Sequence, residues 1–180
     1  MSDDTPAPGS LELVRAYVNS VDLEAPELDA FVSAEGARSL FRRLGTPHAG
    51  LVDADLPALV RLREDLRVAL EAHYDPGSSG PEDLSVFSGA GLAVEAEGGV
   101  LRMGVAGPGI DGVRAFLAAA IWEAQVLGTW PRLKACRRAS CRAAFYDSSK
   151  NGSGAWCSMK ICGNRAKAAR RRLREQGRSD

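Results

Sequence analysis

The sequence predicts an α+β protein, in which a mostly helical N-terminal domain with a small antiparallel hairpin precedes a compact cysteine-bearing module. Apolar residues recur at helical spacing over most of the first 130 positions, with one β-prone interval. All four cysteines of the 180-residue chain lie within 27 residues near its end. We therefore expect two units, residues 1–130 and residues 131–180.

Apolar stripes and capping residues predict the helices of residues 1–130. Ser10 and Ser33 can each cap an amphipathic helix. The clearest helix begins at Asp55 and carries apolar residues at helical spacing until the turn signal at 75–77. A last helix, over 113–127, is so apolar that much of its circumference must be buried. The helix that begins at Asp55 is expected to organise the core.

Between these two long helices the pattern changes to that of strands. Residues 92–96 and 100–105 are short β-prone runs, and Gly98-Gly99 between them is typical of a tight hairpin turn. Residues 84–87 could add a third strand. The sequence thus predicts one small antiparallel sheet on a helical domain.

The formal net charge is zero, but it is divided into two opposite halves. Residues 132–180 contain 14 Lys and Arg against three acidic residues, a formal charge of +11, and the preceding 131 residues carry −11. An acidic body with a basic end suggests a nucleic-acid-binding module on a separate domain. A solvated basic tail without a specific partner would have the same composition.

The cysteine spacing points to a metal. Cys136, Cys141, Cys157 and Cys162 form two C-x4-C pairs separated by 15 residues. The N-terminus has no export signal, which predicts a cytoplasmic protein in a reducing compartment where disulfides are disfavoured. This spacing predicts a tetrahedral four-cysteine zinc site, and with all four positions filled by protein the zinc would be structural. Free cysteines or a redox pair are the alternatives.

The residues around the cysteines predict a treble-clef-like finger. The run 143–147 is strand-like and precedes the turn residues Asn151-Gly152, so we expect the insert between the cysteine pairs to form a hairpin. Ser158 can cap the last helix, which would place Cys157 and Cys162 at its start. Gly163 leaves open whether this helix is continuous or broken in two.

These motifs resemble the CGNR zinc-finger family. The residues that carry the resemblance are Trp156-Cys157-Ser158-Met159 and Cys162-Gly163-Asn164-Arg165-Ala166-Lys167, together with Cys136 and Cys141. The family's N-terminal domain is described as that of a stress-induced transcription regulator, and 17–22 and 62–70 look like parts of it. The resemblance implies transcription regulation through a DNA-binding finger. It also suggests Asn19 and Arg63 as ligand-pocket residues, although a capping Asn and an exposed Arg are the ordinary interpretations.

The last helix is predicted to carry the binding surface. Basic residues recur along one side, and Ala166, Ala169 and Leu173 would form the opposite, packing stripe. Asn164 and Arg165 begin the helix, where a side chain could enter a groove, although Asn164 could equally cap a turn. The expected nucleic-acid-binding residues are Asn164, Arg165, Lys167, Arg170, Arg171, Arg172, Arg174 and Arg178.

The predicted function is that of a DNA-binding transcription regulator with an N-terminal sensing domain. No nucleophile, phosphate-loop or metalloprotease motif nominates an active site, so we expect no enzymatic activity. Expected partners are DNA, a small-molecule effector and a second copy in a homodimer, without a membrane. An RNA-binding zinc protein and a thiol-redox zinc switch are the alternatives.

Overall fold

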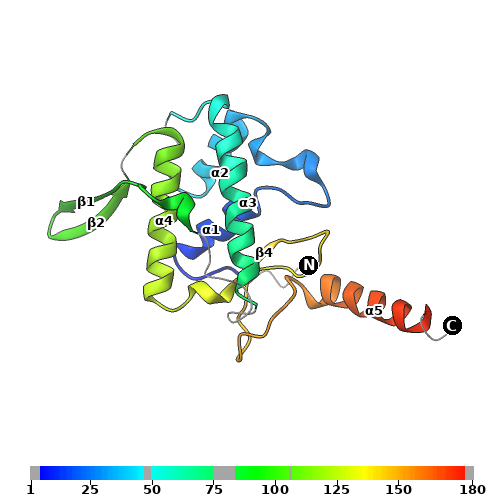
Figure 1. Ribbon diagram of the computed structural model, residues 1–180. Helices are drawn as coiled ribbons and strands as arrows, with labels where there is room; N and C mark the ends of the chain where they lie inside the picture. The colour runs from blue at the N-terminus through cyan, green and yellow to red at the C-terminus, as the bar shows by residue number, and fades with distance from the viewer. Residues whose placement is uncertain (1–4, 47–49, 75–83, 106, 177–180) are drawn as a thin grey trace.

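A computed structural model describes residues 5–46, 50–74, 84–105 and 107–176 of the chain (Figure 1). Its fold is α+β, as predicted, with a helical body, a two-stranded hairpin and a C-terminal module that contains a second pair of strands and the four cysteines. The longer helices and the strands are α1 Leu11–Val18, α2 Ala34–Arg43, α3 Leu56–Ala72, β1 Leu92–Glu97, β2 Val100–Val105, α4 Gly109–Val126, β3 Leu133–Ala135, β4 Ala144–Tyr146 and α5 Asn164–Gln176. Among the described helices, none is long and apolar enough to cross a membrane.

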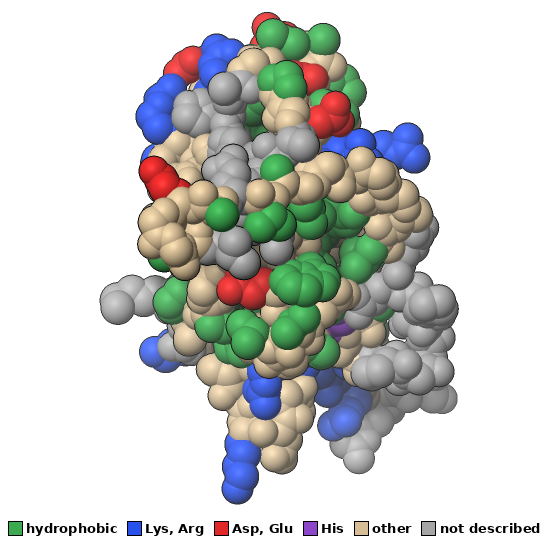
Figure 2. Space-filling view, turned by 90° about the vertical axis from the view of Figure 1, so that its left-hand side faces the viewer, with side chains coloured by type: hydrophobic (Ala, Val, Ile, Leu, Met, Phe, Trp, Pro, Cys, Tyr) green, Lys and Arg blue, Asp and Glu red, His purple; other side chains and the backbone are tan. Residues whose placement is uncertain are grey.

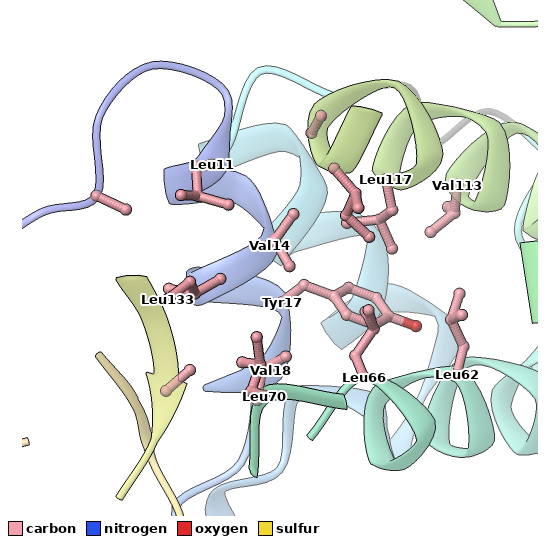
Figure 3. Packing of buried hydrophobic residues seen from close by; sticks show 14 of the residues in the cluster. Leu11, Val14, Tyr17, Val18, Leu62, Leu66, Leu70, Val113, Leu117 and Leu133 are labelled. Atoms are coloured by element: carbon pink, nitrogen blue, oxygen red, sulfur yellow. The ribbon is translucent and has the colours of Figure 1, made fainter. Parts of the chain in front are cut away.

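The core of the body lies where α1, α3 and α4 meet (Figure 3). Tyr17 of α1 is completely buried and points between α3 and α4, and its hydroxyl donates a hydrogen bond of 2.8 Å to the Leu59 carbonyl. The rings of Phe31 and Phe41 pack against the Tyr17 ring at centroid distances of 5.3 and 6.0 Å. The predicted organising helix, α3, therefore contributes one wall of the core, as its apolar spacing indicates.

The two predicted capping serines differ. Ser33 caps α2, because its Oγ accepts a 3.1 Å hydrogen bond from the Gly36 N–H. The prediction for Ser10 is wrong: its backbone is already helical, and its hydroxyl donates to Glu123 of α4 instead. The turn signal at 75–77, expected to end α3, lies outside the described residues; α3 itself ends at Ala72.

The hairpin of β1 and β2 forms as predicted. The strands pair antiparallel, and both glycines of the Gly98-Gly99 turn have positive φ, which a tight turn of this type requires. The third strand predicted at 84–87 is wrong, because Ser85–Phe87 is a 3₁₀ turn. The Arg114 guanidinium donates to the Val86 carbonyl at 2.6 Å, so this carbonyl is bound by a side chain of α4.

The hairpin projects from the body on the side that carries α4, and α5 projects on the opposite side (Figure 1). Hydrophobic side chains gather on the face that bears α4 and the hairpin (Figure 2). Trp122 and Val126 of α4 are among the exposed apolar residues. In contrast, α5, on the opposite side, is part of the basic segment 132–180.

The hydrophobic core crosses the domain boundary predicted near residue 130. Leu133 and Ala135 of β3 and Ala144 of β4 are buried in the same cluster as the side chains of α1 and α3 (Figure 3). β3 packs on α3, and β4 packs on α1. The C-terminal module thus packs on the helical body. The division into two independent domains stays a prediction.

Candidate metal centre and basic helix

The first cysteine pair lies on a tight turn that follows β3. Cys136 comes directly after this strand, and its N–H donates a 2.8 Å hydrogen bond to the Ala143 carbonyl. The N–H groups of Cys141 and Arg142 donate to the Arg138 carbonyl at 2.8 and 3.0 Å, which closes the turn. Arg142 has a φ of 46°, an uncommon value for a residue with a side chain. This turn brings the two sulfurs of the pair together.

The second pair lies where the chain enters the last helix. Ser158 caps this helical start as predicted, because its Oγ accepts from the Ile161 N–H at 3.4 Å. Cys157 precedes the cap, and Cys162 lies within a π-helical turn over Met159–Gly163 that continues directly into α5. Gly163 therefore does not break the segment into two separate helices. The helix begins with one wider, π-helical turn and continues as α5.

The hairpin that places the two pairs differs from the predicted one. Within the described residues, β4 pairs with β3, which precedes Cys136, and not with a strand inside the insert. The two strands thus flank the first cysteine turn. The turn residues after β4 instead surround the carboxylate of Asp147. The sequence predicts the β-prone run and the turn residues after it correctly. It does not predict that β4 pairs with β3, because β3 has only three residues and no alternating pattern.

The four cysteines converge on one point. Their Sγ atoms all lie within 4.8 Å of one another, and the Cys141–Cys157 and Cys157–Cys162 pairs are 3.6 and 3.5 Å apart. All four are free thiols, since these separations exceed the disulfide bond length of about 2.05 Å. Tetrahedral zinc with Zn–S bonds of about 2.3 Å requires sulfurs roughly 3.8 Å apart. The four cysteines therefore fit a zinc ion, and they are the four predicted as its ligands.

The electrostatics of the cluster also favour a cation. Hydrogen bonding with Cys136 and Cys157 lowers the pKa of the Cys141 thiol. Hydrogen bonding with Cys136 and Cys141, together with burial, raises the pKa of Cys157 and opposes a second ionisation nearby. A dication can hold four crowded thiolates because its charge offsets their mutual repulsion.

A buried ion pair joins β3 to the residue that follows β4. Lys134 Nζ donates to Asp147 Oδ2 at 2.8 Å, and both side chains are almost completely buried. The N–H groups of Ser149 and Gly154 also donate to this carboxylate, at 3.0 and 2.7 Å. Burial would raise the pKa of Asp147, but these hydrogen bonds outweigh it and lower the pKa to about 2. A Cβ at Gly154 would lie 2.6 Å from the carboxylate, so only glycine allows this approach.

The sequence carries one weak signal for this pair. Asp147 is one of three acidic residues in the basic segment 132–180, and such an isolated acid suggests a structural role. Its partner could not be identified in the same way, because Lys134 is one of 14 basic residues there.

The comparisons with known proteins identify this module. Residues 132–175 match the family model of the CGNR zinc finger. This segment is a CGNR zinc finger. No curated protein matches the chain. The match begins after residue 131, so the resemblance of the N-terminal domain to a stress-induced transcription regulator stays a prediction.

Asn19 and Arg63, the predicted pocket residues, have different surroundings. Asn19 holds the CGNR finger on the body: its Nδ2 donates to the Ala144 carbonyl at 2.9 Å, and its Oδ1 accepts from the Ala144 N–H at 2.8 Å. Arg63 is buried and binds both oxygens of Asp29, at 2.6 and 2.8 Å, and the hydroxyl of Ser20. Their role in ligand binding stays a prediction.

A second arginine of α3 also reaches the finger. Arg67 is completely buried, and its guanidinium donates to the carbonyls of Arg142 and Val18 at 2.8 and 2.9 Å. His73 approaches the Leu133 carbonyl through its Nδ1, at 2.5 Å. These contacts join α3 to α1, to the first cysteine turn and to β3. The sequence gives no sign of them, since their partners are backbone atoms.

The last helix, α5, extends away from the body (Figure 1), and its described side chains are almost all exposed. The predicted packing stripe is wrong, because Leu173 is 68% exposed and α5 has no buried residue. Helical periodicity places Leu173 on a stripe, but within the described residues no apolar surface covers that stripe. Arg171 forms an ion pair with Glu175 at 2.7 Å. The other exposed basic residues of the helix are Arg165, Lys167, Arg170, Arg172 and Arg174; Arg178 lies outside the described residues.

The side chains of the two residues at the start of α5 both form hydrogen bonds within the protein. Asn164 Nδ2 donates to the Lys160 carbonyl at 3.0 Å, which is the capping arrangement considered above. Arg165 contacts the carboxylate of Glu24, which belongs to the body. The same carboxylate binds Arg138 of the first cysteine turn, and this hydrogen bond lowers the pKa of Glu24. Sequence reasoning missed both Glu24 and Arg138.

Proposed function

We propose that this protein is a DNA-binding regulator of transcription whose CGNR finger, folded around a structural zinc, holds the nucleic acid. The observation that supports the proposal most is α5, which extends away from the body beyond the Arg165–Glu24 contact at its start and has exposed basic side chains. Zinc with four thiolates carries a formal −2, so residues 132–180 would keep about +9 when metal is bound. This charge attracts phosphate, and arginine forks can bind phosphate bidentately or read guanine.

The proposed zinc would be held by Cys136, Cys141, Cys157 and Cys162, and it would act as a structural cross-link without catalysing a reaction. Cys136 and Cys162 are buried, which keeps water from this side of the site. The helical start that carries Cys162 continues into α5, so the metal would fix the direction of the basic helix. We accordingly propose a binding protein and no enzyme.

The proposal is tested by selecting bound sequences from random duplex DNA beside random RNA. If five or six basic residues of α5 contact phosphates, log affinity for B-DNA should fall against log salt with a slope of about −5. Enrichment of a duplex motif supports a transcription regulator. Preference for single-stranded RNA would support the RNA-binding alternative, and reversible zinc loss under mild peroxide would support the redox switch.

A matched pair of variants separates a local contact from a general charge effect. Arg171→Glu should flatten the salt slope and weaken binding to all duplex sequences alike. Arg61→Glu is the control, because Arg61 and Arg171 are 84% and 82% exposed and each pairs with an acidic residue four positions on. Equal effects of the two substitutions would place the DNA elsewhere.

We propose further that the N-terminal domain senses a small effector. A groove of about 550 Å³ lies between α3 and α4, and its lining includes Leu62, Val86, Ile110 and Arg114. This volume is in the range of small-molecule sites. A metabolite that binds there should raise the thermal unfolding midpoint, and Arg114→Ala should abolish the increase. A homodimer and a role in the stress response are also proposals, and the second rests on the family resemblance alone.

A further inference from the structure

Two arginines of the CGNR finger meet at a single carboxylate of the body. Arg138 Nη1 donates to Glu24 Oε1 at 2.8 Å, and its Nη2 contacts Oε2 of the same side chain. Arg165 Nη1 lies 3.2 Å from Oε1 and 3.5 Å from Oε2. Arg138 belongs to the first cysteine turn and Arg165 to the first turn of α5. Two separate parts of the finger thus converge on one anionic group.

The arginines are oriented by the finger itself. Arg138 Nε lies 3.2 Å from Sγ of Cys162, so its guanidinium is bound on one side by the metal centre. Its Nη1 also donates to the Ser140 hydroxyl at 2.6 Å. Arg138 is only 14% exposed, whereas Arg165 is 58% exposed. A guanidinium held in this way presents its remaining donors in a fixed direction.

A planar fork that binds two oxygens of a carboxylate also matches two oxygens of a phosphate. We propose that Arg138 and Arg165 form a subsite for a backbone phosphate of the nucleic acid, and that Glu24 occupies this subsite in the free protein. The inference rests on the proposed function and adds a site next to the metal centre, outside the basic residues that follow in α5. Binding would exchange the carboxylate of Glu24 for the phosphate.

Glu24 is placed to leave without disturbing the core. It lies on a short turn after α1 that is closed by hydrogen bonds of 2.9 Å from Glu24 N–H to Asp22 Oδ1 and from Ala25 N–H to the Asp22 carbonyl. Its side chain is 41% exposed. The body therefore contributes a replaceable anion, and it would lower the affinity of the whole chain for DNA through a specific contact.

The test compares Glu24→Gln with Glu27→Gln in the full-length zinc protein. Glu27 is exposed in the same segment, so its substitution removes the same charge without removing this contact. Glu24→Gln should bind a duplex of random sequence about fivefold more tightly than the unchanged chain, a factor at the upper end for one exposed ion pair, because this carboxylate contacts two arginines. Glu27→Gln should change affinity less than about twofold, because solvent and salt screen a separated charge.

A second comparison examines the subsite itself. Arg165→Ala should weaken DNA binding more in the Glu24→Gln background than in the unchanged chain, because Glu24 no longer competes for Arg165. An equal loss in both backgrounds would overturn the inference. The inference would also be overturned if the Glu24→Gln variant unfolded at a lower temperature but bound DNA no better than Glu27→Gln. Glu24 would then only hold the finger on the body.

Failure of the proposed function has a different signature. If neither the unchanged chain nor the variants bind duplex DNA at low salt, the DNA-binding proposal falls and the phosphate subsite falls with it. If the unchanged chain binds duplex DNA with the expected salt slope while the two glutamate substitutions act alike, only the subsite is overturned.

Discussion

Replacing Leu133 by Ala tests whether the CGNR finger and the helical body unfold as one cooperative unit. Leu133 belongs to β3 of the finger, yet it is completely buried against α1 and α3 (Figure 3). A finger that folded independently would tolerate the loss of this side chain without effect on the body. A shared core predicts that the same loss destabilises both parts together.

The expected loss of stability follows from the complete burial of the Leu133 side chain. Substituting a fully buried leucine by alanine removes its apolar contacts and leaves a cavity, which costs about 2–5 kcal/mol of the free energy of unfolding. A protein of this size loses about 2–4 °C of its midpoint for each kcal/mol, so the midpoint should fall by roughly 4–20 °C. The matched control is Leu173→Ala in α5, where the side chain is 68% exposed and the cost should be less than about 0.5 kcal/mol.

The assay follows heat unfolding of the zinc-loaded protein with two probes. Circular dichroism reports the helices, most of which belong to the body, and a chelating dye reports zinc released from the finger. Both midpoints should coincide in the unchanged chain, and Leu133→Ala should lower both by the same amount. Zinc release at a lower temperature than helix loss, with only the first midpoint moved by the substitution, would refute the shared core.

The remaining predictions concern the metal, the docking contact and the buried pair. Cys162→Ser should abolish zinc binding as measured by metal analysis, and because four-thiolate sites contribute about 10 kcal/mol to folding, the finger should lose its structure. Asn19→Ala removes both hydrogen bonds to the Ala144 backbone and should cost about 1–3 kcal/mol in urea unfolding. Asp147→Asn leaves Lys134 buried without its counter-charge and should cost about 3–5 kcal/mol by the same measurement.

The metal centre could be predicted from sequence because its chemistry is local. Four cysteines in two C-x4-C pairs within 27 residues are typical of a zinc site, and Ser158 has the side chain that a helix start requires. The long helices and the hairpin turn at Gly98-Gly99 were predictable for the same reason. In each case residues close in sequence determine the structure.

The contacts between body and finger could not be predicted, because they join positions distant in sequence. Asn19 and Ala144 are 125 residues apart, and Glu24 and Arg165 are 141 apart. Asn19 binds a backbone, which has no signature in the sequence. Glu24 is one of 20 acidic residues before position 132, and only the fold brings it to the start of α5. The error in the packing stripe of α5 has a related cause, since helical periodicity cannot tell whether a surface exists to cover Leu173.

The pH dependence of the Asp147→Asn effect provides a final test. The folded pKa of Asp147 is about 2, below its ordinary value of 3.8, so the ionised carboxylate stabilises the fold fully above 3.8 and loses this effect as the pH falls towards 2. Zinc thiolates bind protons before this range is reached, so acid should release the metal while the Lys134 pair is still charged. The difference in unfolding free energy between Asp147→Asn and the unchanged chain should therefore be constant from about pH 8 down to about pH 5. A difference that grows steadily as the pH falls over this range would show that the carboxylate takes up protons in the folded protein, because proton uptake by the folded state alone stabilises it, and the ionised pair could not then be what holds β3 to the residues after β4.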